Sequence, residues 1–254
     1  MRPSSIAALI LFLPLLPEAA FAWPDHCKFG ADRSVSLPVA GVARLEIVGR
    51  GGDLKVGSTS SPTIAGSGRA CASSAALLEK TQIRSTQEGP NARVFVQVPD
   101  GELGSGYATL DLTVLVPAGV TVEVTDTSGD TDVESVRLAR VTDSSGDVTV
   151  RDVTGDLEVN DSSGDLRFTN VDGALTVTDS SGDLTVDTVK SLRVVRDSSG
   201  DMRIERVSGN VVIEADSSGD IEIDHVGGNV DVLSDSTGDR SIRDVKGTVH
   251  VPED

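Results

Sequence analysis

The sequence predicts an all-β protein: a two-sided parallel β-solenoid of about 18 residues per coil with an N-terminal β-rich cap. The phrase Asp-Ser-Ser-Gly-Asp, or a close variant, recurs along the chain, and its starts are separated by 17, 18, 18, 18, 19 and 19 residues. Between copies, apolar and polar residues alternate, which is typical of strands with one buried face. A turn that returns at a nearly fixed interval, with such strands between, predicts stacked coils.

One coil can be followed along residues 164–179. A glycine turn is followed by a strand in which Leu166 and Phe168 face the same way, and Val171 is expected to turn the corner. A second strand then places Leu175 inward. We expect successive coils to pair in parallel about 4.8 Å apart. Around residues 190–197 the apolar phase slips by one, which predicts a β-bulge.

The chain divides into a signal peptide at residues 1–22, a β-rich cap at residues 23–118 and the solenoid repeats at residues 119–254. The first segment has a basic residue, an apolar run interrupted by prolines and the sequence Ala20-Phe21-Ala22, which fits a cleavage site. That run is too short and too interrupted for a membrane span. We therefore expect an extracytoplasmic protein, either periplasmic or secreted to the cell surface.

The chain has two cysteines, Cys27 and Cys71, and neither lies in a Cys-x-x-Cys motif. In an oxidising compartment an isolated pair is most simply a structural disulfide. We expect that disulfide to staple the cap.

The formal net charge of −18 weighs against binding to nucleic acid or anionic lipid. It favours a basic or cation-bridged ligand, and the partner is expected in the envelope or at the surface. Aromatic residues make up only 3% of the chain. This weighs against a sugar-binding groove, which depends on aromatic side chains.

The recurring turns carry the one constellation that could do chemistry. Stacking places the first aspartate of each turn in one row and the last in another. The first row is Asp126, Asp143, Asp161, Asp179, Asp197, Asp216 and Asp235. The second row is Asp130, Asp147, Asp165, Asp183, Asp201, Asp220 and Asp239.

Neighbouring carboxylates about 5 Å apart repel by about 1 kcal/mol even in water, so something should offset that repulsion. Aspartate and serine side chains in turns accept hydrogen bonds from nearby main-chain N–H groups, which needs no cofactor. Calcium ions between coils are the alternative, because hard cations prefer carboxylate oxygens. A basic partner is the third reading.

No residue is predicted to be catalytic, and we expect no enzyme activity. His26, His225 and His250 are scattered without zinc-ligand spacing. The acidic residues recur equally in every coil, whereas an active site needs one coil that differs from the rest.

The segment Val116-Pro117-Ala118-Gly119, followed by successive Ser-Ser-Gly-Asp and Val-x-Gly-Asp turns, resembles a bacterial β-strand-repeat domain of unknown function whose members are labelled putative adhesins. The resemblance extends over roughly residues 40–250. It implies a β-solenoid in the envelope or outside the cytoplasm, and it brings no set of catalytic residues.

These observations favour an exported, non-enzymatic, adhesin-like binding module. The alternative is a periplasmic structural or envelope-stress accessory protein. A carbohydrate-active β-helix enzyme is a third reading, which the scarcity of aromatic residues disfavours.

Overall fold

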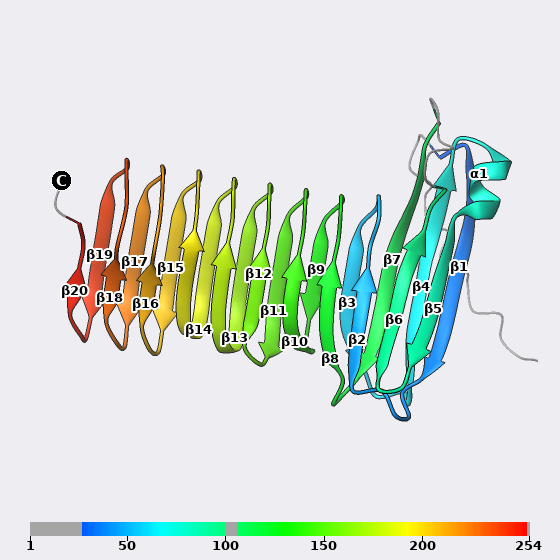
Figure 1. Ribbon diagram of the computed structural model, residues 1–254, viewed down its shortest axis with the longest axis horizontal. Coiled ribbons are helices and arrows are strands. Elements are labelled where there is room, and N and C mark those ends of the chain that lie inside the picture. The colour runs from blue at the N-terminus through cyan, green and yellow to red at the C-terminus, as the bar shows by residue number, and fades with distance from the viewer. Residues whose placement is uncertain (1–26, 100–105, 253–254) are drawn as a thin grey trace, which may run out of the picture.

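The protein is one elongated stack of strands with the cap at one end and the last coil at the other (Figure 1). The computed structural model describes residues 27–99 and 106–252. The predicted signal peptide, residues 1–22, lies outside the described residues. The all-β class and the parallel solenoid of about 18 residues per coil are confirmed.

Two sheets form the long sides of the stack, and each coil contributes a strand to both. Two long strands, β13 (Leu166–Thr178) and β14 (Leu184–Arg196), pass from one sheet to the other. Beside them the first sheet contains β7 (Ala108–Pro117), β3 (Leu54–Thr59), β9 (Thr131–Glu134), β11 (Val148–Thr154), β15 (Met202–Val207), β17 (Ile221–Val226) and β19 (Arg240–Val245). The second sheet contains β6 (Asn91–Gln97), β2 (Arg44–Val48), β8 (Thr121–Thr125), β10 (Arg137–Thr142), β12 (Leu157–Asn160), β16 (Val211–Ile213), β18 (Val230–Val232) and β20 (Val249–His250).

Strands of successive coils pair in parallel with equivalent residues opposite each other. In the first sheet Val148 lies opposite Leu166, and Leu166 lies opposite Leu184. The predicted slip is a bulge: Val177 pairs with Val194 but Thr178 pairs with Arg196, so Val195 is the extra residue. Two further register shifts occur, after Leu138 in β10 and between Val171 and Ala174 in β13. On either side of each shift the interior positions stay aligned, because a lasting one-residue shift would turn the interior side chains to solvent.

The cap continues both sheets with antiparallel strands. On the first sheet β7 pairs with β4 (Thr63–Ala72), which pairs with β1 (Phe29–Pro38). On the second sheet β6 pairs with β5 (Gln82–Glu88). The helix α1 (Ala75–Lys80) lies at the outer end of the cap (Figure 1). Its first turn is capped by the Ser74 hydroxyl, which accepts from the Leu77 N–H at 3.2 Å.

The parallel stacking extends into the segment predicted as a cap. The strands β2 and β3 pair in parallel with β8 and β9 and with β6 and β7. They form a coil that joins the antiparallel strands to the repeats, so the sheets run on without an open edge between them.

The interior is a continuous apolar core from the cap to the last coil. Each coil supplies the same positions, mostly Val, Leu and Ile, and equivalent side chains stack on one another. Phe168 is fully buried in the middle of this array, between Val150 and Val186 of the adjoining coils. Burial of apolar surface is the main stabilising contribution in a solenoid. Because each coil contacts only its neighbours, that burial occurs between adjacent coils.

Candidate functional site

The two aspartates of each Asp-Ser-Ser-Gly-Asp turn face opposite ways. The first aspartates, which we call the inner row, are buried: Asp126, Asp143, Asp161, Asp179, Asp197 and Asp216 are 0–6% exposed. Asp235 in the last turn has a side chain that is 3% exposed. The last aspartates of the turns, the outer row, lie at the surface. The stack therefore contains one row of carboxyl groups inside and one outside.

Turn N–H groups approach the inner carboxyls from one side. The Asp179 Oδ1 accepts from the Ser180 N–H at 2.6 Å and from the Ser181 N–H at 3.2 Å. The Asp197 Oδ1 accepts from the Ser199 N–H at 3.1 Å. Asp179 and Asp197 therefore help to close their own turns.

The other side of the inner row is not satisfied. Among the residues that the structure describes, several buried carboxyl oxygens of this row have no hydrogen-bond partner. They are both oxygens of Asp143, Asp161 and Asp216, the Oδ2 of Asp179 and Asp197, and the Oδ1 of Asp235. Buried polar atoms without partners are rare in folded proteins and need a physical explanation.

Burial disfavours the charged form of these groups. Burial, the larger cause, and the neighbouring inner aspartates together raise the pKa of Asp161 and of Asp197 to about 7. Burial also raises the pKa of Asp216 to about 6. The pKa values of Asp143 and Asp179 are raised for the same first reason, while the turn N–H groups moderate each rise.

The inner row ends at different neighbours on its two sides. At the cap end, Gly49 occupies the place next to Asp126, and the Thr131 hydroxyl donates to the Asp126 Oδ2 at 3.5 Å. At the far end, Arg240 stands in an interior column that is otherwise apolar in the neighbouring coils, and its Nη1 lies 3.6 Å from the Asp235 Oδ2. Among the residues that the structure describes, no Lys, Arg or His side chain pairs with the rungs from Asp143 to Asp216.

The outer row links each coil to the next. The Asp165 N–H donates to the Asp147 Oδ1 at 2.9 Å, and the Asp183 N–H donates to the Asp165 Oδ1 at 3.0 Å. The same contact recurs along the row. The outer row therefore contributes main-chain hydrogen bonds and also presents a line of carboxylates to solvent.

The second serine and the glycine of each turn also contact the preceding coil in the same way along the stack. The Ser181 hydroxyl donates to the Ser162 carbonyl of the preceding coil at 3.2 Å, and Ser163 donates to Ser144 in the same way. The turn glycines have φ between +107° and +140°, a region that disfavours side chains. Each is packed directly on the carbonyl of the preceding turn glycine.

A second column of equivalent residues lies at the opposite corner of the coils, and the sequence patterns did not predict it. One residue per coil has a left-handed backbone with φ between 46° and 64° although it is not glycine. The column is Ser135, Asp152, Asn170, Thr188, Arg206, His225 and Asp244. Aspartate and asparagine at three of these positions were a usable signal, because both tolerate this conformation. The remaining four positions carry Ser, Thr, Arg and His, so the column has no common residue type in the sequence.

Charged side chains pair across coils beside this corner. Arg206 pairs with Asp187 of the preceding coil and with Glu205, and Arg203 pairs with Glu205 and Glu222. The Arg206 guanidinium holds the pKa of Asp187 below its usual value. Arg243 extends the network in the last coil by pairing with Glu222.

His225 lies between two carboxylates at this corner. Its Nδ1 is 3.0 Å from the Asp224 Oδ1, and its Nε2 is 3.3 Å from the Asp244 Oδ2. Within the part of the chain that the structure describes, this is the one group of three His, Cys, Asp or Glu side chains whose ligand atoms lie within 4.8 Å of one another. In the described ranges the inner and outer rows form no such group, and calcium binding by them stays an alternative interpretation to hydrogen bonding within the turns.

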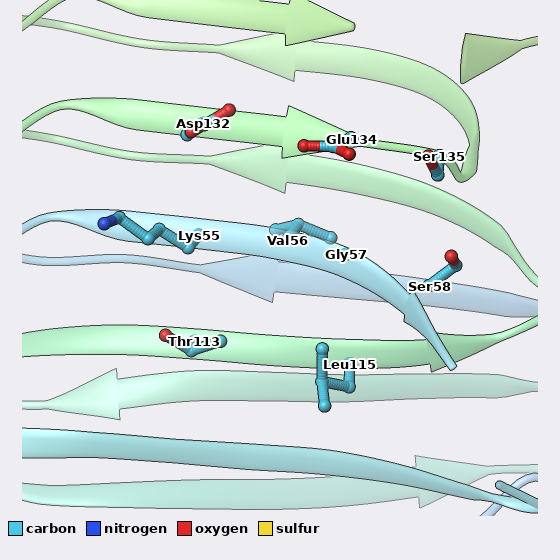
Figure 2. A pocket seen from close by; sticks show the side chains of 9 residues that line it. All are labelled: Lys55, Val56, Gly57, Ser58, Thr113, Leu115, Asp132, Glu134 and Ser135. Carbon is cyan, nitrogen blue, oxygen red and sulfur yellow. The ribbon is translucent and has the colours of Figure 1, made fainter. Parts of the chain in front are cut away.

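A depression of about 310 Å³ lies where the first coil meets the cap. Figure 2 shows Asp132 and Glu134 on one strand, Lys55 on the next and Leu115 on the third. Leu115 is 40% exposed. Both acidic side chains pair with Arg151. No histidine or cysteine is among the residues lining this depression, and it has no nucleophile paired with a base.

Cys27 and Cys71 form the predicted disulfide, with their Cα atoms 5.5 Å apart. It joins the segment just before β1 to β4, and these two strands pair along their whole length. No helix in the described ranges has the length and apolar character needed to cross a membrane.

A family model described as Toastrack DUF4097 matches residues 34–195. None of the curated proteins matches the chain. Among solved structures, one from Parabacteroides distasonis, described as a "putative lipid binding protein", is 16% identical, with a TM-score of 0.53 over 86% of this chain and 96% of that one. One from Clostridium sporogenes, described as a "putative cell adhesion protein", is 12% identical, with a TM-score of 0.41 over 88% of this chain and 100% of that one.

Proposed function

The chain belongs to the Toastrack DUF4097 family, and from that premise we propose that it is an exported, non-enzymatic β-solenoid that acts as an adhesin-like binding module. The family has no assigned function, so the proposal depends on the surfaces of this chain. Its two sheets present the outward side chains of every coil.

One observation carries the proposal: interior positions repeat from coil to coil, while the outward positions on the sheet faces, away from the turns, do not. Beside the apolar column at Leu166 and Leu184, the outward column of the first sheet reads Thr149, Arg167, Thr185, Arg203 and Glu222. A repeat array that varies only on its outside is typical of an extended binding surface. A catalytic site would instead need one coil with its own cluster of groups.

The disulfide supports export, because such bonds persist in oxidising compartments. The outer row indicates the chemistry of the ligand. Its carboxylates lie along one edge of the stack, and all but Asp165 are exposed. A basic or cation-bridged partner would find a line of charges there, and nucleic acid would be repelled.

Protease treatment of intact cells tests the location. We expect the mature protein to be cut on intact cells, before the envelope is permeabilised. Protection until permeabilisation would contradict surface exposure and would support the periplasmic accessory role. A cytoplasmic protein, protected until the cells are lysed, would overturn export as well.

Binding of a lysine-rich peptide tests the outer row. We expect Asp147→Asn/Asp183→Asn to weaken binding several-fold at low salt, because two charges leave the row. The matched control, Glu79→Gln/Glu88→Gln, removes the same charge from exposed positions in the cap. Equal weakening by both pairs would reduce the effect to net charge and contradict a specific outer-row surface.

A further inference from the structure

The inner row joins two features that conflict at first sight. Its carboxyl groups stack coil upon coil, about 4.8 Å apart as parallel strands require, and they are almost completely removed from solvent. Two charged carboxylates at that spacing inside a protein repel strongly. Yet the rungs from Asp143 to Asp216 have unpartnered oxygens.

A shared proton resolves this conflict. When one carboxyl of a neighbouring pair is protonated, its O–H becomes a donor and the next carboxylate is an acceptor. The terminal torsion of aspartate is soft, so a small rotation can turn an oxygen toward the next rung. The proton then removes one charge and gives partners to two buried oxygens. Pairs of carboxyls that share a site behave in this way.

A metal ion fits the inner row less well. Calcium takes six to eight oxygen ligands, but each gap between rungs is flanked by only two inner carboxyls. The neighbouring interior columns in the chain are apolar: Val159, Val177 and Val194 precede the aspartates, and Leu166, Leu184 and Met202 follow them. The one described three-ligand group lies elsewhere, at Asp224, His225 and Asp244.

The charged groups around the row favour proton uptake. Besides the inner aspartates themselves, Asp130 acts on Asp143 and Asp165 acts on Asp179, and both raise the pKa of the group they face. Arg240 is the cation at the end of the row, beside Asp235. Thr131 is a neutral donor at the other end. The middle rungs therefore face negative charge or apolar side chains.

We propose that the inner row is a proton-sharing ladder, in which neighbouring aspartates from Asp143 to Asp216 hold protons between their unpartnered oxygens. The folded solenoid then keeps protons at neutral pH that the unfolded chain releases to solvent. Its stability depends on pH in the direction opposite to that of most acidic proteins.

The sign follows from linkage. Burial raises the pKa values of the inner aspartates in the folded state, from the ordinary value of 3.8 to about 7 for Asp161 and Asp197. Between these values the folded state binds more protons than the unfolded state, so stability falls as pH rises. The contribution is fully present below pH 3.8 and is lost as pH rises toward about 7.

Thermal unfolding of the mature protein in chelator-containing buffer measures this dependence. We expect Tm to rise by at least about 5 °C when pH is lowered from about 7.5 to about 5. Infrared difference spectra should show protonated carboxyl groups in the folded protein at neutral pH. This readout needs no variant, so it stands even where a substitution prevents folding.

Matched variants locate the effect. Asp143→Asn/Asp179→Asn replaces alternate rungs with amides, which donate permanently to the carboxylates beside them. We expect it to raise Tm at pH about 7.5 and to reduce the pH dependence by about a third or more. The control Asp147→Asn/Asp183→Asn removes two outer carboxylates from the same turns and should change Tm equally at both pH values.

Three results would overturn the proposal. One is a Tm that is constant or falls on acidification. The second is an infrared spectrum without protonated carboxyls at neutral pH. The third is a Tm at neutral pH that rises on addition of calcium and falls with chelator, because a cation would then occupy the row in place of protons.

Discussion

Glycine in the turn is required for two separate reasons, which the stacked geometry combines. Gly182 has φ +135°, and a Cβ built there would lie 1.9 Å from the carbonyl oxygen of Gly164. The first reason is the cost of a left-handed backbone. The second is that the main chain of one coil approaches the next too closely for any side chain.

Gly182→Ala should lower the free energy of unfolding by about 2–4 kcal/mol, because both costs apply. Gly89 is the matched control: its φ is +58°, and nothing lies within 4 Å of a Cβ built there. Gly89→Ala should cost about 1 kcal/mol. Urea denaturation followed by circular dichroism measures both, and equal losses would contradict the close approach between coils.

Thr188 has a strained backbone of a different kind from that of the turn glycines. It is a β-branched residue at φ 64°, where its side chain crowds the backbone. Thr188→Gly should therefore stabilise the protein by about 0.5–1 kcal/mol, despite the loss of a hydroxyl bond to Asp187. Thr185→Gly, in the extended part of β14, should instead destabilise by about 1 kcal/mol. Urea denaturation decides the sign, and a loss at both sites would exclude strain at the corner.

At the scale of elements, the cap depends on antiparallel pairing that the solenoid does not use. β1 is the outermost strand, pairing only with β4 among the described strands, and the disulfide lies at one end of that pair. An outer strand with one partner frays readily. The disulfide limits fraying by closing a loop with a sequence separation of 44.

Cys27→Ser/Cys71→Ser should destabilise the cap by about 4 kcal/mol in the chain-entropy model. Because coils contact only their neighbours, we expect the loss to appear as faster amide hydrogen exchange in β1 and β4, with β15 and β17 unchanged. A uniform increase along the whole stack would show that the cap and the coils unfold together and would contradict the local effect.

At the scale of the whole molecule, stability is a sum of coils and of the contacts between them. A defect in the middle weakens contacts on both sides, whereas a defect in the last coils weakens contacts mainly on one side. Phe168 and Val232 allow a comparison, since both are buried and they lie in the middle and near the end of the array.

Phe168→Ala should cost about 3–5 kcal/mol and should separate the unfolding of the two halves into distinct transitions. Val232→Ala should cost about 1–2 kcal/mol and leave the first half of the array unchanged. Urea unfolding monitored by hydrogen exchange in each half provides the measurement. A single cooperative transition in Phe168→Ala would contradict the additive view of the array.

The fold could be predicted from the sequence because the features that determine it are local and recur once per coil. The turn phrase, with glycine at its fourth position, and the alternation of Leu166 and Phe168 repeat once per coil, so stacking follows from the spacing alone. The bulge at Val195 was readable for the same reason, since it interrupts a period.

The corner column and the ends of the inner row were harder to predict from the sequence, because they depend on the direction that the main chain gives each side chain. The corner column at Thr188 and Arg206 has no common residue type, and only the main-chain path reveals it. Thr131 and Arg240 became meaningful as ends of a row only when the columns were in place.

The sequence by itself determined the coil length, the apolar interior, the disulfide partners and the repeated turn, because each is encoded by neighbouring residues or by a period. Only the tertiary structure decided which aspartate of each turn faces inward. The two aspartates flank Ser-Ser-Gly with the same side chain, so composition does not distinguish them. The path of the turn directs Asp179 into the interior and Asp183 toward solvent, and burial then gives the two rows different chemistry.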